Sequence, residues 1–161
     1  MVNFLTKKAV REAQKLWGAN FIKIGEAFSK GLDYKLLAEE FVNRHYGYQE
    51  GIVLFKPTLS SVEQFRDTYE KAISYFIAGN AKFPEDVGFA LQPWKSVKFR
   101  NAGIIHIKNH AVAMGNYFFT DFEGKVTKVE YTFGYFLSDD GFLKINVHHS
   151  SIPFNLSLIH I

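Results

Sequence analysis

The chain has 161 residues, and its 19 basic and 16 acidic side chains give a formal net charge of +3. This length is typical of one domain with a sizeable core, and so small and scattered a charge excess argues against a nucleic-acid-binding surface. There is no cysteine, which excludes disulfides, thiolate catalysis and cysteine-bound zinc. We find no signal-peptide pattern and no apolar run of the roughly 20 residues that a membrane helix needs. The sequence therefore predicts a single cytoplasmic domain over residues 1–161.

The first half of the chain has helical periodicity. Apolar residues recur at steps of three to four over residues 7–31, and Gly31 is a natural helix end. Asp33 is expected to cap a second helix that ends near residue 46. The segment 51–58 follows as a short strand closed by Pro57.

A third helix is expected to begin at Ser60 or Ser61. Ser60 and Glu63 have the spacing of a capping box. Apolar residues from Phe65 onward form one stripe, and the helix should end at residues 78–80.

After residue 85 the apolar period changes to two, which predicts strands. The expected strands are 88–92 together with 96–107, then 110–120, 126–137 and 142–150. Helices followed by a run of strands indicate an α+β fold, with the N-terminal helices packed in a strongly curved antiparallel sheet. A cone or half-barrel of this kind leaves a pocket lined by several elements.

The outer face of this sheet is expected to carry apolar residues. Met114, Phe118 and Phe136 stand there among polar neighbours. Since exposed apolar surface of this kind often marks an interface, we expect a homodimer.

The segment "KINVHHSSIPF", residues 144–154, ends the last strand with two histidines and two serines. In a strand, alternate residues share a face, so His148 pairs with Ser150 and His149 with Ser151.

Strict alternation groups the apolar residues at 143, 145 and 147 with His149 and Ser151. A bend or bulge at the strand end would exchange the two faces. Both assignments stay open on this evidence.

Chemical motifs around these histidines are incomplete. His106 and His110 flank a turn and offer further ligands, but there is no HxH or HExxH spacing and no cysteine. A Ser-His-Asp triad lacks its GxSxG turn. On residue types alone, a polar strand end is the more frequent explanation.

Six sequence blocks nevertheless resemble the iota-class carbonic anhydrase family. They occur in that family's order: "VLFKPT" (53–58), "EQFRDTYEKAISYFIAGN" (63–80), "GFALQPWKSVKFRNAGI" (88–104), "AVAMGNYFFTD" (111–121), "KVEYTFGYF" (128–136) and "INVHHSSIPF" (145–154). This family is part of the nuclear-transport-factor-2-like, cystatin-like superfamily, which is related to the association domain of calcium/calmodulin-dependent kinase II. The final segment "NLSLIHI" matches no block, and we assign His160 no role.

The resemblance implies reversible hydration of CO2 to bicarbonate. By motif, Thr58, Tyr75, His148 and Ser150 are implied as catalytic residues, and Thr58, Tyr75 and Ser150 also as substrate-binding residues. His149 and Ser151 are the alternative pair if the other face lines the pocket.

The resemblance leaves the metal requirement open, because some relatives need none and others are metal-dependent. From the histidine spacing we expect no metal cofactor, with Mn²⁺ or Zn²⁺ not excluded. His148 is then the side chain whose usual pKa suits it to accept the proton of water. The alternative function is a non-catalytic small-ligand-binding or oligomerisation domain, because one fold hosts many functions.

Overall fold

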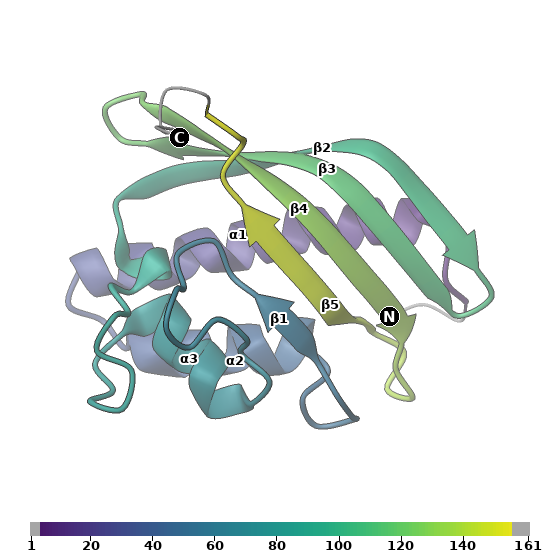
Figure 1. The fold of residues 1–161 in the computed structure, drawn as a ribbon, viewed down its shortest axis with the longest axis horizontal. Coiled ribbons are helices and arrows are strands. Elements are labelled where there is room, and N and C mark those ends of the chain that lie inside the picture. Colours follow the sequence, from purple (N-terminus) through teal and green to yellow (C-terminus); the bar gives the residue numbers. More distant parts are fainter. Residues whose placement is uncertain (1–3, 156–161) are drawn as a thin grey trace, which may run out of the picture.

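The computed structural model describes residues 4–155 as three helices lying against one face of a five-stranded sheet (Figure 1). His160 and the rest of the C-terminal tail lie outside the described residues. The prediction of an α+β fold with N-terminal helices in a curved sheet is confirmed. The sheet has the order β1-β5-β4-β3-β2 and remains open, because β1 and β2 are its two edges.

Local signals account for the first two helices. Helix α1 spans Lys7–Ser29, and its N-cap Thr6 accepts a hydrogen bond from the Ala9 amide at 3.0 Å. Helix α2 spans Tyr34–His45, and the Asp33 carboxylate accepts from the Leu36 amide as expected. Between them Gly31 has a φ of +69°, a conformation that glycine adopts without strain.

The third helix, α3, is Tyr69–Ile77 with Thr68 as its N-cap, so the predicted start at Ser60 or Ser61 is wrong. Ser60 donates its hydroxyl to backbone carbonyls instead of accepting from an amide. The amide of Glu63, which a capping box would pair with the Ser60 hydroxyl, donates to the distant Glu85 carboxylate instead, as do the amides of Ser61 and Val62. These hydrogen bonds lower the pKa of Glu85 to about 2. A tertiary partner has therefore replaced the local cap.

The strands lie where the sequence predicts them, with one exception. Strand β1 is Leu54–Lys56, β2 is Trp94–Ile107, β3 is His110–Asp121, β4 is Val126–Leu137 and β5 is Leu143–Ser151. The expected strand segment 88–92 is instead a 3-10 turn, η1, at Phe89–Leu91, which begins after Gly88 with a φ of +77°. Strands β2 to β5 are antiparallel, whereas the short β1 pairs parallel to β5 at the edge.

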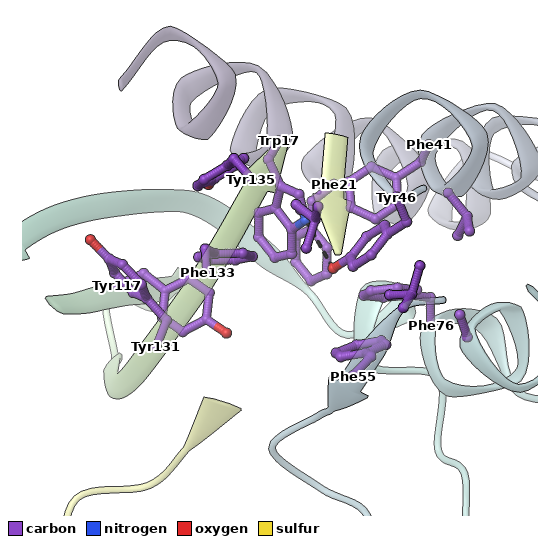
Figure 2. Packing of buried hydrophobic residues seen from close by; sticks show 14 of the residues in the cluster. Trp17, Phe21, Phe41, Tyr46, Phe55, Phe76, Tyr117, Tyr131, Phe133 and Tyr135 are labelled. Atoms are coloured by element: carbon purple, nitrogen blue, oxygen red, sulfur yellow. Dashed lines mark hydrogen bonds between the residues drawn. The ribbon is translucent and has the colours of Figure 1, made fainter. Parts of the chain in front are cut away.

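The core between helices and sheet is largely aromatic (Figure 2). Trp17 of α1 lies at its centre and stacks on Phe21, with ring centroids 5.1 Å apart. Strand β4 contributes every second residue from Val129 to Tyr135, as the period of two predicts. Tyrosine hydroxyls are the main polar groups in this core, so their partners determine its chemistry.

Candidate active site

Polar side chains from four elements meet in a small buried cavity. They are Thr58 after β1, Tyr75 on α3, Tyr117 on β3, and His148 and Ser150 on β5. Aromatic rings of Trp17, Phe55, Phe76 and Phe89 form the remaining wall. The cavity has a volume of about 10 Å³, which is at the lower limit for a single water molecule.

These groups form a continuous series of hydrogen bonds. Thr58 Oγ1 lies 2.6 Å from Ser150 Oγ, and Ser150 Oγ lies 2.5 Å from the Tyr117 hydroxyl. The Tyr117 hydroxyl is 3.0 Å from His148 Nε2, and His148 Nδ1 is 2.8 Å from the Tyr46 hydroxyl. Tyr75 is connected differently, because its hydroxyl accepts from the Leu59 amide at 3.2 Å. Hydroxyl groups therefore surround the space in which a small molecule would bind.

A bulge in β5 decides which histidine faces inward. In the pairing of β4 with β5, Gly134 lies opposite Val147 but Tyr135 lies opposite Ile145, so Asn146 is an extra residue. Ile145 is buried before the bulge, and His148 and Ser150 are buried after it. The residues that face the core are therefore odd-numbered before the bulge and even-numbered after it. His148 and Ser150 face inward for this reason.

His149 and Ser151 lie on the other face of β5. His149 is exposed, and Ser151 donates its hydroxyl to the Glu130 carboxylate at 2.9 Å. Of the six residues singled out from the sequence, the structure brings Thr58, Tyr75, His148 and Ser150 together and leaves this pair outside the cavity.

The His148 ring is held between two phenylalanines. Its centroid is 4.0 Å from that of Phe133 and 4.7 Å from that of Phe55, in both cases nearly parallel. Burial, together with the charge of His149 nearby, lowers its pKa well below the usual value. His148 is therefore a neutral imidazole, with both nitrogens engaged in hydrogen bonds.

Burial acts in the opposite direction on the phenols. It raises the pKa of Tyr75 and of Tyr117 above the usual value of tyrosine, and hydrogen bonds to neighbouring groups only partly offset this. Both hydroxyls stay protonated at any physiological pH and serve as hydrogen-bond donors.

A buried ion pair fastens the segment that carries Thr58. Arg66 is fully buried and forms two hydrogen bonds of 2.7 Å to the Asp86 carboxylate, while its own amide donates to the Phe55 carbonyl. Ser74 on α3 also donates to Asp86. The segment is thereby tied to both β1 and α3, the two elements that flank the cavity.

Tyr117, Tyr46 and Trp17 belong to the site although the sequence did not single them out. The alternation of β3 gave a signal for Tyr117, because Ala111, Ala113 and Tyr117 share its inner face. Nothing local connects Tyr46 or Trp17 to His148, which lies 102 residues after Tyr46 and still further after Trp17.

The histidines do not assemble into a metal site in the described chain. His106 Nε2 lies 2.8 Å from the Lys108 carbonyl in an exposed turn. Within residues 4–155, no group of three His, Asp or Glu side chains could hold an ion. Over the same residues, no helix is both long enough and apolar enough to cross a membrane.

Comparison with solved structures identifies the fold. The chain superposes on a putative calcium/calmodulin-dependent protein kinase II association domain from Xanthomonas campestris with a TM-score of 0.61 and 23% identity, covering 91% of this chain and 87% of the other. Fold and site together define an α+β protein of that architecture with a buried cavity lined by hydroxyls and one imidazole.

Sequence comparison identifies the family. The family model of metal-independent carbonic anhydrase matches residues 8–152, and the chain belongs to this family. It is 44% identical over 153 residues to a metal-independent carbonic anhydrase of Nostoc sp., covering 93% of this chain and 75% of the relative. The iota-carbonic anhydrase from a cyanobacterium, solved in complex with bicarbonate, superposes with a TM-score of 0.92 and 40% identity over 96% of each chain. The chain is therefore a carbonic anhydrase, and the non-catalytic alternative is not favoured.

Proposed function

We propose that CO2 is hydrated in the cavity between Thr58, Tyr75 and Ser150, and that no metal ion takes part. One observation carries the proposal: three protonated hydroxyls line a small cavity whose other walls are mainly aromatic. CO2 is apolar and fits against the rings, whereas bicarbonate is an anion and needs the donors. The bicarbonate complex of the 40% identical cyanobacterial enzyme supports this ligand.

The reaction in this cavity is addition of water to CO2. The water oxygen forms a bond to carbon, and one C=O electron pair moves to its oxygen, where hydrogen bonds from hydroxyls stabilise the new charge. A second water molecule takes the proton that the attacking water loses, which leaves bicarbonate. The donors are most effective here because few water molecules compete for the anion.

Substrates require more room than the closed cavity offers, since its volume is that of about one water. The 2.6 Å contact between Thr58 and Ser150 is the natural place to open. Each hydroxyl then exchanges its partner for the substrate, so that binding leaves no buried donor unpaired.

A CO2-hydration assay on chelator-treated protein tests the metal-free reaction. We expect EDTA followed by dialysis to leave most of the activity, in agreement with the description of the family as metal-independent. Added Mn²⁺ or Zn²⁺ should then change little. Activity that disappears on dialysis and returns with one of these ions would refute the proposal.

Two adjacent serines allow a matched test of the site. Ser150→Ala removes a hydroxyl from the cavity and should lower turnover on the order of 10²-fold, the usual cost of losing one oxyanion donor. Ser151→Ala removes a hydroxyl of the same size on the outer face, where it contacts Glu130, and should change turnover little. Equal turnover of the two variants would show that the cavity is not the site.

A further inference from the structure

The series of hydrogen bonds that contains His148 extends beyond the cavity. Beyond His148 the series continues through the Tyr46 hydroxyl to the Trp17 indole nitrogen, 3.2 Å further on. Figure 2 shows this last contact between α1 and the residue that follows α2. The members in order are Trp17, Tyr46, His148, Tyr117, Ser150 and Thr58.

The direction of the first hydrogen bonds follows from the donors available. The indole N–H of Trp17 can only donate, so the Tyr46 oxygen accepts from it. Tyr46 has one hydroxyl hydrogen, and within the described residues His148 Nδ1, at 2.8 Å, is the one group placed to accept it. Nδ1 is therefore unprotonated, and the neutral ring of His148 has its proton on Nε2.

The remaining hydrogen bonds then point toward the cavity. Nε2–H of His148 donates to Tyr117, Tyr117 donates to Ser150, and Ser150 donates to Thr58. The hydroxyl hydrogen of Thr58 is left to donate to Tyr75, with which Thr58 also interacts, or to a molecule that binds in the cavity.

The other tautomer of His148 would reverse this direction. With the proton on Nδ1, Tyr117 would donate to Nε2, and Thr58 would turn its hydrogen toward Ser150 and away from the cavity. The hydroxyl of Tyr46, which is 1% exposed, would then lack an acceptor among the described residues. An unsatisfied buried donor costs about 1–3 kcal/mol, so the arrangement favours the Nε2–H form.

The series of hydrogen bonds ends at Trp17, which cannot accept a proton. An indole nitrogen has no lone pair to accept a proton, so a proton arriving at Tyr46 cannot move on. The six groups are thus a directed set of donors and not a route to solvent. The expected role of His148 as a free base does not suit this arrangement.

We propose that Tyr46 is a positioning residue, which holds His148 in the Nε2–H tautomer and so directs the hydroxyl hydrogens of Ser150 and Thr58 away from Tyr117 and toward bound bicarbonate. The identity of the bound anion rests on the proposed function, whereas the tautomer of His148 is independent of it. It also assigns His148 the role of orienting Tyr117 and Ser150.

Two-bond ¹⁵N–¹H NMR correlation of the histidine rings tests the tautomer on the full chain near neutral pH and without substrate. The signals of His148 are identified by their loss in His148→Gln. We expect wild type to be protonated at Nε2, and Tyr46→Phe to show a substantial Nδ1–H population. A wild-type ring protonated at Nδ1 would overturn the proposal, whether or not Tyr46→Phe folds.

Kinetics of bicarbonate dehydration give a second measurement. Tyr46→Phe should raise KM for bicarbonate about two- to tenfold, the effect of losing one hydrogen bond of about 0.5–1.5 kcal/mol. Tyr135→Phe is the matched control. Tyr135 is also buried and stacks on Phe133, but it is not part of the series of hydrogen bonds from Trp17 to Thr58. A Tyr46→Phe variant that folds and equals this control in both tautomer and KM would refute the proposal. An inactive wild-type protein with the Nε2–H tautomer would refute the proposed function alone.

Discussion

Single hydroxyl groups distinguish this cavity from the aromatic core around it. Tyr75 packs like any core residue, with its ring 5.8 Å from Phe89 and 6.1 Å from Phe55. Only its hydroxyl faces the cavity and the Leu59 amide. Packing and chemistry are therefore separable at this residue.

Tyr75→Phe should lower turnover on the order of 10²-fold while stability changes little. The ring contacts remain, and the freed Leu59 amide belongs to an exposed residue that water can reach. CO2-hydration rates and thermal melts on the same samples provide the measurement. Tyr69→Phe, on the same helix but outside the cavity, is the control, and comparable rates in the two variants would contradict the assignment.

Two buried histidines make stability depend on pH. Burial, with the Arg44 charge as a second cause, lowers the pKa of His45 to about 3, and burial also lowers that of His148. Below about pH 6.5 the unfolded chain binds protons that the folded chain excludes, so the free energy of unfolding decreases as pH falls. This loss continues down to the folded-state pKa values.

Between pH 6.5 and 5 we expect a decrease of up to about 1.4 kcal/mol per pH unit for each of these histidines. Urea unfolding at several pH values measures the slope, and His45→Gln should remove the share of one histidine. An identical slope in the variant and in wild type would show that His45 is not held neutral.

Among the helices and strands, β5 has the feature that matters most for the site, because its bulge determines which of its side chains face the cavity. Gly134 makes the bulge possible, since a Cβ there would lie 2.9 Å from Val147 Cβ and 3.0 Å from the side-chain oxygen of Asn146. The Cβ of Val147 cannot retreat without moving the strand segment that leads to His148. A glycine on β4 thus controls the direction of side chains on β5.

Gly134→Ala should therefore reduce both stability and activity. Crowding in a packed sheet costs about 1–3 kcal/mol, equivalent to a fall in Tm of about 2–12 °C for a chain of this size. Gly103→Ala in β2 is the control, because no atom lies within 4 Å of its added Cβ. Melts and rates that match in the two variants would show that the close approach at Gly134 does not hold the bulge.

For the whole molecule, the outer face of the sheet carries an exposed apolar surface that bears on its assembly. Ile105 and Val112 lie opposite each other on β2 and β3, and Met114 follows on the same strand, with exposed fractions of 64%, 44% and 57%. Phe118 and Phe136 on this face are half-buried. We propose that a second copy of the chain covers this apolar surface.

Light scattering at micromolar concentration should give about twice the chain mass of 18.5 kDa. Met114→Lys places a charge in the apolar surface and should shift the protein toward the monomer, because an unpaired charge is costly to bury. A monomeric wild type at this concentration would disprove the dimer.

Local causes specify the elements that can be predicted from the sequence. The caps Thr6 and Asp33 and the apolar periods specify α1, α2 and the alternation of β4, since each depends on residues a few positions apart. The residues Thr58, Tyr75, His148 and Ser150 came from the family resemblance, and the structure brings them together.

Other features depend on partners that are distant in the sequence and follow from the tertiary fold. Glu85 accepts from the Glu63 amide that the capping box at Ser60 should have bound, and α3 begins at Tyr69. Gly134, on another strand, sets the bulge that turns His148 inward. A repeat of two or three to four residues describes one element by itself, whereas side-chain direction after a bulge and hydrogen-bond polarity depend on groups that only folding brings together.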